Sequence, residues 1–272
     1  MSVTRPFILF LALAVLHLPR AQGLVLDWNA PGVDWPDPLP RVLSQSFDID
    51  PGNPGNDITI NIAEVGGTGF LTVHGSGNQP PNDVAYHTGG TPGNQSLFLN
   101  VNFDEENGLD YIEITIIFNY TLGVNNLTFS VFDVDRVTTG GQNFIDALTN
   151  FAGTFGASTV YPTLTGSSAN TITGSGATIR ADGTGGNPDA SAGGNVSINF
   201  GSSPVSQVVF RYASGDVPGV NANPTSQSIG FSAVTFDAVV PEPSVYISAL
   251  LLLAGISAYE IRRRLGNYTA KS

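Results

Sequence analysis

Residues 111–120 read YIEITIIFNY and carry the clearest structural signal in the chain. Every second residue from Ile112 to Tyr120 is large and apolar, whereas Glu113, Thr115 and Asn119 between them are polar. A repeat of two places alternate side chains on opposite faces of a strand, so one face is buried and the other hydrated. Antiparallel sheets have this character. The segment therefore predicts a strand of an antiparallel sheet.

The same alternation recurs along most of the chain. Clusters of Gly, Asn and Pro separate the alternating segments, as expected of turns. We therefore predict an all-β protein, an antiparallel two-sheet β-sandwich that is jelly-roll-like and has roughly eight to ten strands. The further strand segments are 57–62, 96–103, 127–131, 196–200, 205–213 and 229–236.

Three regions depart from this pattern. Phe144, Leu148 and Phe151 lie four and three residues apart, and this spacing predicts a helix over 143–151. Residues 26–40 are rich in Trp, Asp and Pro, and we expect them to run extended along an edge of the domain. Residues 166–194 are rich in Gly, Ser, Thr and Asn, which indicates either a loose pair of hairpins or a mobile loop.

Composition limits the function. The chain has 272 residues and no cysteine, which excludes disulfides, cysteine-ligated metals and thiol catalysis. Residues 24–240 contain 20 acidic residues and four arginines, a net charge of −16. Such a surface repels the phosphates of nucleic acid, so we expect no nucleic-acid partner. It can attract divalent cations.

The N-terminal residues 1–23 have the pattern of a secretory signal peptide. Arg5 precedes the apolar run 7–18, and the small residues Ala21 and Gly23 precede a cleavage site before Leu24. We expect this segment to form a signal helix that the Sec translocon and signal peptidase process.

The C-terminal region has three parts in a fixed order. Pro241-Glu242-Pro243 is followed by the apolar run 244–261 and then by Arg262-Arg263-Arg264. As a helix, 18 residues reach roughly 27 Å, close to the thickness of a membrane core. Three adjacent arginines keep that end of a transmembrane helix in the cytoplasm, together with the tail 266–272.

This C-terminal arrangement resembles a PEP-CTERM sorting signal, a feature of exported proteins of Gram-negative bacteria. The resemblance covers roughly residues 239–265, and it implies that an exosortase-type transpeptidase recognises the Pro-Glu-Pro triplet and cuts near it. It identifies a delivery route rather than an activity. The expected organisation is a signal peptide at 1–23, a β-sandwich domain at 24–240, a sorting segment at 241–265 and a cytoplasmic tail at 266–272.

Aspartates gather in the turns that follow predicted strands. Asp48, Asp50 and Asp57 surround a Pro-Gly-Asn turn, and Asp133 and Asp135 follow the strand at 127–132. Calcium prefers several oxygen ligands, so these residues are candidate ligands of one structural Ca²⁺. The clusters at 104–110 and 182–189 are similar in composition, and none has the EF-hand spacing.

The same aspartates have an alternative interpretation without a metal. Asp and Asn side chains commonly accept hydrogen bonds from the backbone of their own turn. Asp135 and Arg136 could instead form an ion pair at the end of the strand.

Three aromatic residues are candidates for carbohydrate binding. Trp28, Trp35 and Tyr86 could stack on the apolar faces of sugar rings. The alternative is that the tryptophans pin the N-terminal segment onto the sandwich, because large aromatic residues usually pack in a core or at its edge.

Catalytic patterns are weak. Glu105, Glu106 and Glu113 are candidate carboxylates for glycoside hydrolysis, but the sequence pairs none of them with a partner across a cleft. His74 and His87 are expected to be turn or surface residues, since no G-x-S-x-G motif accompanies them.

These observations predict an exported, non-enzymatic protein of the cell surface or extracellular matrix, associated with adhesion or exopolysaccharide. Its precursor would cross the inner membrane once with a cytoplasmic C-terminus, before an exosortase-type enzyme processes it. The alternative is a secreted carbohydrate-binding module or a glycoside hydrolase that acts on polysaccharide.

Overall fold

The computed structural model describes residues 23–36, 41–71, 80–82, 86–104, 109–137, 144–215, 226–239 and 254–255. The chain divides into one unit of residues 22–239 and another of residues 1–21 with 240–272. The fold below is that of the first unit. In the second, only Ala254 and Gly255 are described, and both are helical. Within the described ranges, no helix has the length and apolar character needed to cross a membrane.

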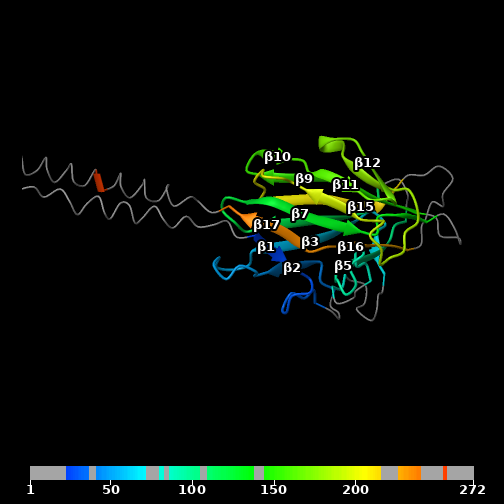
Figure 1. The fold of residues 1–272 in the computed structure, drawn as a ribbon, viewed down its shortest axis with the longest axis horizontal. Coiled ribbons are helices and arrows are strands. Elements are labelled where there is room, and N and C mark those ends of the chain that lie inside the picture. The colour runs from blue at the N-terminus through cyan, green and yellow to red at the C-terminus, as the bar shows by residue number, and fades with distance from the viewer. Residues whose placement is uncertain are drawn as a thin grey trace, which may run out of the picture. The chain divides into compact units, whose positions relative to one another are not determined.

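The first unit consists of two antiparallel sheets, which confirms the predicted all-β class (Figure 1). The first sheet has the order β1 (Gly23–Leu26), β17 (Val234–Ala238), β7 (Val124–Phe132), β16 (Gln227–Phe231), β5 (Leu97–Asn102) and β4 (Gly69–Phe70). In the same sheet, β14 (Val196–Asn199) pairs with β7 and with β11 (Thr163–Gly166).

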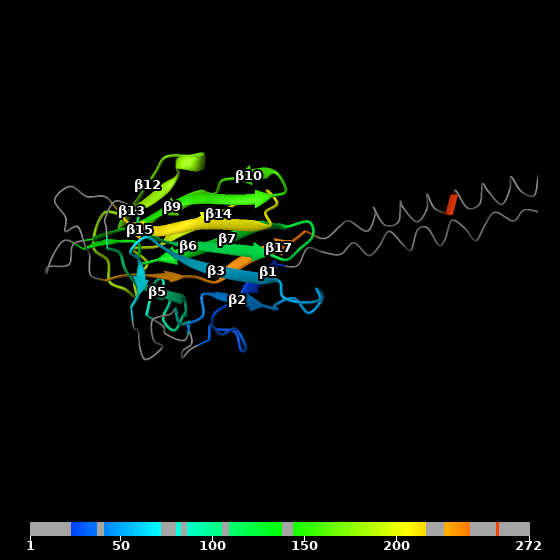
Figure 2. The same ribbon diagram turned by 180° about the vertical axis from the view of Figure 1, so that it is seen from behind.

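The second sheet lies behind the first and is seen from the other side in Figure 2. Its order is β12 (Asn170–Thr173), β13 (Arg180–Gly183), β9 (Phe144–Phe155), β15 (Gln207–Ser214), β6 (Tyr111–Phe118), β3 (Ile58–Val65) and β2 (Ser44–Phe47). Two short strands, β8 (Arg136–Val137) and β10 (Ser158–Val160), also pair with β9. The described residues thus form 17 strands, more than the predicted number, because several are only two to four residues long.

Strand β6 has the predicted alternation of exposed and buried residues along its whole length. It lies between β3 and β15, where Ile114 is opposite both Ile62 and Phe210. Its inward face therefore packs in the centre of the domain, as the pattern at 111–120 indicated.

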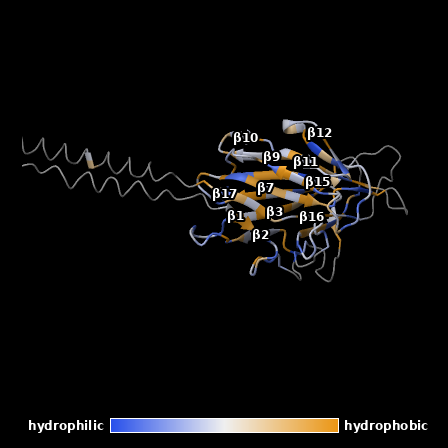
Figure 3. Cartoon of the chain, in the orientation of Figure 1, coloured by the Kyte–Doolittle hydropathy of each residue, from blue (hydrophilic) through white to orange (hydrophobic). Residues whose placement is uncertain are grey.

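Aromatic side chains from the two sheets meet between them. Phe129 on β7 lies 5.5 Å from Phe210 on β15, and Phe118 on β6 lies 5.1 Å from Phe236 on β17, measured between ring centroids. Apolar colour follows the strands that face this layer in Figure 3. Edge-to-face and offset rings fill such a layer at favourable geometry, so the fold is sandwich-like with one continuous core.

The predicted helix at 143–151 is wrong, because these residues belong to β9. This strand is covered on both faces near its start, where five consecutive residues are buried. Phe144, Leu148 and Phe151 are all buried, but they reach the interior from a strand.

A β-bulge explains the misleading spacing in β9. Val209 of β15 pairs with Ala152 and Arg211 with Thr149, so β9 advances three residues where β15 advances two. Asn150 in this interval has a φ of 55°. The extra residue shifts the alternation by one. Two core residues of β9 therefore lie three apart, a spacing that resembles a helix.

The other two irregular regions are ordered where they are described. Trp28 and Trp35 are buried in the core, so the N-terminal segment packs against the domain. Residues 170–183 form a hairpin of β12 and β13 joined through the short 3₁₀ helix η1 (Gly176–Thr178).

The two ends of the domain are neighbours. β1 pairs antiparallel with β17, and Gly23 is opposite Asp237. β17 in turn pairs with the start of β7, where Ala238 is opposite Val124. The far end of β7, at Phe132, therefore lies at the opposite end of the sheet from both Gly23 and Ala238.

Candidate functional site

The first aspartate turn is organised by one buried carboxylate, that of Asp57. Its Oδ2 accepts hydrogen bonds from the backbone N–H groups of Ile49 (2.7 Å) and Asp50 (2.6 Å). Its Oδ1 accepts one from Asn53 Nδ2 at 2.7 Å. Asp48 is exposed at the surface of the same turn. In this structure the turn closes on its own backbone donors.

The second aspartate turn follows β7 and is buried. Asp133 Oδ1 accepts a hydrogen bond from Asn187 Nδ2 at 3.1 Å, and Asp135 Oδ2 accepts one from the Asn187 backbone N–H at 2.7 Å. The alternative of an Asp135–Arg136 ion pair is not realised, because no such pair occurs among the described residues. Asp133 also has a φ of 63°, an uncommon backbone conformation for a residue other than glycine.

A third aspartate, which the sequence analysis did not single out, completes this group. Asp146 on β9 is buried, and its Oδ1 accepts a hydrogen bond from Tyr212 Oη at 2.7 Å. Its Oδ2 accepts one from the Asp135 backbone N–H at 3.2 Å, and its own N–H donates to the Asp135 carbonyl at 2.9 Å. The second turn is therefore fastened to the second sheet through Asp146.

Burial changes the acidity of this group. It raises the pKa of Asp133 to about 7 and that of Asp135 to about 6, and neighbouring carboxylates add to both shifts. Burial also raises the pKa of Asp146 well above its ordinary value. A carboxylate removed from water without a cation beside it retains its proton more strongly.

His87 connects the second turn to β16. Its Nε2 lies 3.0 Å from Ser228 Oγ, and its Nδ1 lies 3.3 Å from Asp133 Oδ2 and 3.2 Å from the Asp189 carbonyl. His87 lies in a bend, but it is not a surface residue as the sequence allowed, since its side chain is 0% exposed. Burial lowers the pKa of His87 to about 4.

This chain of side chains has the connectivity of a Ser-His-Asp triad. A triad uses an imidazole that a substrate can reach and an ionised aspartate beside it. Here the imidazole is enclosed, and the pKa values favour a neutral histidine and a protonated Asp133 at mildly acidic pH. In this structure the three residues form a buried hydrogen-bond network.

Among the described residues, no group of three or more His, Asp or Glu side chains is placed to hold one metal ion. The calcium sites at Asp48, Asp50 and Asp57 and at Asp133 and Asp135 stay predictions.

The aromatic residues chosen for sugar binding do not form one surface. Trp28 and Trp35 are each 1% exposed, so neither presents a face to a sugar ring. Trp28 packs edge-on against Phe47 at 5.7 Å between centroids. The carbohydrate assignment of both tryptophans is therefore wrong, and the alternative of packing residues is correct. Tyr86 is 41% exposed and lies 5.3 Å from Phe98.

Of the candidate catalytic carboxylates, Glu113 pairs with Arg211 across β6 and β15, at 2.9 Å between Oε2 and Nε. Glu105, Glu106 and His74 lie outside the described residues. Pro241, Glu242, Pro243 and the Arg262–Arg264 cluster of the sorting signal also lie outside them.

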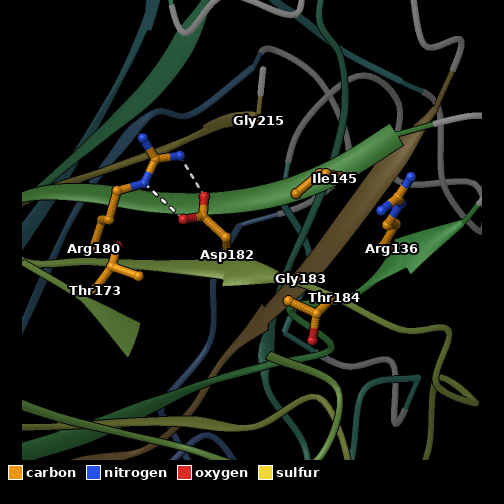
Figure 4. A pocket seen from close by; sticks show the side chains of 8 residues that line it. All are labelled: Arg136, Ile145, Thr173, Arg180, Asp182, Gly183, Thr184 and Gly215. Atoms are coloured by element: carbon orange, nitrogen blue, oxygen red, sulfur yellow. Dashed lines mark hydrogen bonds and ion pairs between the residues drawn. The ribbon is translucent and has the colours of Figure 1, made fainter. Parts of the chain in front are cut away.

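A pocket of about 400 Å³ opens next to the second aspartate turn (Figure 4). Strands β8, β9, β12 and β13 and the end of β15 contribute to its lining. The lining residues are Arg136, Ile145, Thr173, Arg180, Asp182, Gly183, Thr184 and Gly215. Sequence reasoning missed it, although two of the four arginines of an acidic domain were a usable signal.

No family model, curated protein or solved structure matches this chain. The candidate site is therefore interpreted from its own geometry.

Proposed function

We propose that this protein is an exported, non-enzymatic module of the cell surface or extracellular matrix, delivered by a PEP-CTERM-type route. One observation carries the proposal: the fold begins at Gly23 and ends at Ala238, and the two end strands are paired. Apart from Gly23, which precedes the expected cleavage site before Leu24, the strands of the domain thus lie between that site and the triplet at 241–243.

The pairing of the end strands places both chain ends of the domain at one end of the sheet. A tether that follows β17 holds the domain at the end where Gly23 and Ala238 lie. The second aspartate turn and the pocket adjoin the opposite end of β7. We further propose a jelly-roll-like arrangement for the two sheets.

The alternative of a secreted carbohydrate-binding module is favoured by the pocket, which has the size of a small-ligand site. It differs from the leading proposal in the role of the ligand rather than in the route of export. The glycoside hydrolase alternative has less support, because Glu113 is engaged by Arg211.

The sorting route is tested with Glu242→Ala in the full chain, expressed with and without an exosortase-type enzyme. We expect wild type to be processed only when the enzyme is present, and Glu242→Ala to stay as an uncut, membrane-held precursor. Asp48→Ala, a change at an exposed acid, serves as the control and should be processed normally. A mature mass of Glu242→Ala equal to wild type would refute the recognition of the triplet.

The non-enzymatic part is tested with a fluorophosphonate probe, which labels serines activated by a histidine. We expect no labelling of Ser228, because its partner His87 is enclosed. Labelling that disappears in Ser228→Ala would show instead that the network is a working nucleophile.

Calcium binding is tested by the melting temperature in excess Ca²⁺ and in chelator. A ligand at one hundred times its Kd stabilises by about 2.7 kcal/mol, which is roughly 5–10 °C for a domain of this size. Asp133→Asn and Asp48→Asn would then show which turn holds the ion. Equal melting temperatures in both buffers would withdraw the prediction.

A further inference from the structure

The pocket of Figure 4 has a composition that suits one class of ligand. We propose that it binds a sugar unit carrying a single carboxylate, such as one uronic acid residue within an otherwise largely neutral polysaccharide. This inference rests on the proposed function, because it names the ligand class of the exported module.

Two glycines allow the walls of the pocket to approach one another. A Cβ at Gly183 would lie 1.8 Å from the Asp135 carbonyl oxygen, and a Cβ at Gly215 would lie 2.8 Å from Ile145 Cγ2. Both distances are too short for any larger residue. The end of β13 can therefore pack directly against the second aspartate turn, and just beyond Thr184 the Gly185 carbonyl accepts a hydrogen bond from the Arg136 backbone N–H at 3.2 Å.

Arg136 is a cation whose side chain pairs with no carboxylate among the described residues. Within the described residues, the other three arginines each pair with a carboxylate: Arg41 with Glu64, Arg180 with Asp182 and Arg211 with Glu113. Arg136 has no such partner there, and its buried Nε–H donates no hydrogen bond. A guanidinium left in this state is well suited to a carboxylate, which it can bind through two parallel hydrogen bonds.

The second arginine of the pocket is already fixed in place. Arg180 Nε donates to Asp182 Oδ2 at 2.7 Å, and its Nη2 also bonds to the same carboxylate. In Figure 4 this pair and Arg136 stand on opposite sides of the pocket. The lining therefore has a net charge of +1, which favours a ligand with a single negative charge.

The remaining side chains fit a sugar ring. Thr173 and Thr184 provide hydroxyls, and the Asp182 carboxylate can accept hydrogen bonds from the hydroxyls of a sugar. Ile145 provides an apolar contact for the C–H face of a ring. A volume of about 400 Å³ lies within the range of small-ligand pockets.

The charge of the whole domain separates this ligand from more highly charged anions. Residues 24–240 have a net charge of −16, so a nucleotide or a polyphosphate would be repelled on approach. A sugar with a single carboxylate experiences much weaker electrostatic repulsion from the domain. Uronic acids combine that single charge with the hydroxyls that the threonines and Asp182 require.

The test is calorimetric titration of the purified full chain in detergent with methyl glucuronoside, methyl glucoside and sodium sulfate. We expect the glucuronoside to bind with a Kd on the order of 1 mM, as is usual for one small ligand. Methyl glucoside, which lacks the carboxylate, should bind at least roughly tenfold more weakly because it forms no charge-assisted hydrogen bond with Arg136.

Two variants assign the site. Arg136→Gln should weaken glucuronoside binding roughly tenfold, whereas the control Arg41→Gln, which removes the same charge elsewhere, should leave it unchanged. A melting curve for each variant confirms that it is folded.

Equal binding of glucuronoside and glucoside would overturn the role of the carboxylate, and sulfate binding as tight as that of glucuronoside would overturn the sugar specificity. Binding that survives Arg136→Gln, or no binding by folded wild type, would overturn the site. Processing of Arg136→Gln in the exosortase assay separates these failures from a failure of the proposed function, because that assay does not depend on the pocket.

Discussion

The two aspartate turns of this domain share an Asp-x-Asp pattern but lie in opposite environments. Asp48-Ile49-Asp50 follows β2 at the edge of its sheet, and Asp48 is exposed there. Asp133-Val134-Asp135 follows β7, which lies inside its sheet, and both aspartates are buried. An Asp-x-Asp turn thus takes its character from the strand that it follows.

The second turn is buried because residues from later in the chain pack against it. Gly194 packs against Asp133 and Gly183 against Asp135. A Cβ at Gly194 would lie 2.8 Å from Asp133 Cα, and one at Gly183 would lie 1.8 Å from the Asp135 carbonyl oxygen. The first turn is held from within by Asp57, a residue of its own loop. Asn119, which follows β6, also donates to the Asp57 and Asn56 carbonyls, each at 2.8 Å. The carboxylate that organises the first turn is therefore local, whereas the groups that enclose the second turn come from distant parts of the chain.

The largest effect that we expect comes from Asp146→Ala, which removes the anchor of the second turn. The change leaves the buried Tyr212 hydroxyl and the Asp135 backbone N–H without their acceptor. The expected loss is about 3 kcal/mol, or a fall in melting temperature of roughly 6–12 °C. Asp146→Asn keeps an acceptor oxygen and should lose less. Equal losses in both variants would contradict this account.

Asp57→Ala should have the next largest effect, on the first turn. It removes one side-chain and two backbone hydrogen bonds within the loop. We expect a loss of about 2 kcal/mol in the free energy of unfolding, measured by chemical denaturation. Asp48→Ala is the matched control and should stay within about 0.5 kcal/mol of wild type. A large loss in the control would mean that the first turn is not closed by Asp57 alone.

The pH dependence of stability should separate the turns further. The folded pKa of Asp133, about 7, exceeds its ordinary value of 3.8. The protonated carboxyl therefore contributes fully to folding stability below pH 3.8, and this contribution is lost as the pH rises through 7. Between pH 6.5 and 8 this loss is about 1 kcal/mol, or roughly 2–4 °C in melting temperature. His87, with its pKa lowered to about 4, opposes the trend only below pH 6.5.

Asp133→Asn should flatten the dependence between pH 6.5 and 8, whereas Asp48→Asn should leave it as in wild type. An unchanged slope in Asp133→Asn would assign the titration to another group.

The smallest effect is expected for Asp50→Ala. Asp50 Oδ1 accepts one hydrogen bond from the Gly52 backbone N–H at an exposed position. Its loss should cost about 0.5 kcal/mol, which denaturant curves of wild type and variant can resolve when they are run side by side. A cost as large as that of Asp57→Ala would make the two carboxylates equal partners in the turn.

The strands were predictable where one face is buried and the pairing is regular. The segment at 111–120 is the clearest case, because alternation in the sequence matches alternation of burial in β6. In β9 alternation failed as a guide for two reasons. The bulge near Asn150 changes the spacing of the buried residues, and the start of the strand is buried on both faces, so polar and apolar residues do not alternate there.

The candidate site was predictable only in part. The aspartates at 133 and 135 were recognised from the sequence, but their burial depends on Asn187 and on Asp146, which lie far along the chain. The pocket requires β8, which carries Arg136, and β13, which carries Arg180, to pair with the same strand, β9. No local sequence pattern indicates which distant strands will be neighbours.

The pairing of β1 with β17 also determines when the first sheet can be completed during synthesis of the chain. β1 is the first strand of the domain to be synthesised, and its partner is the last, more than 200 residues later. Contacts of such long sequence separation form slowly. Until residue 238 is available, the first sheet keeps an open edge at β7, where β17 will pair. The first sheet is therefore complete only when β17, the last strand of the domain, has been synthesised and lies between β1 and β7.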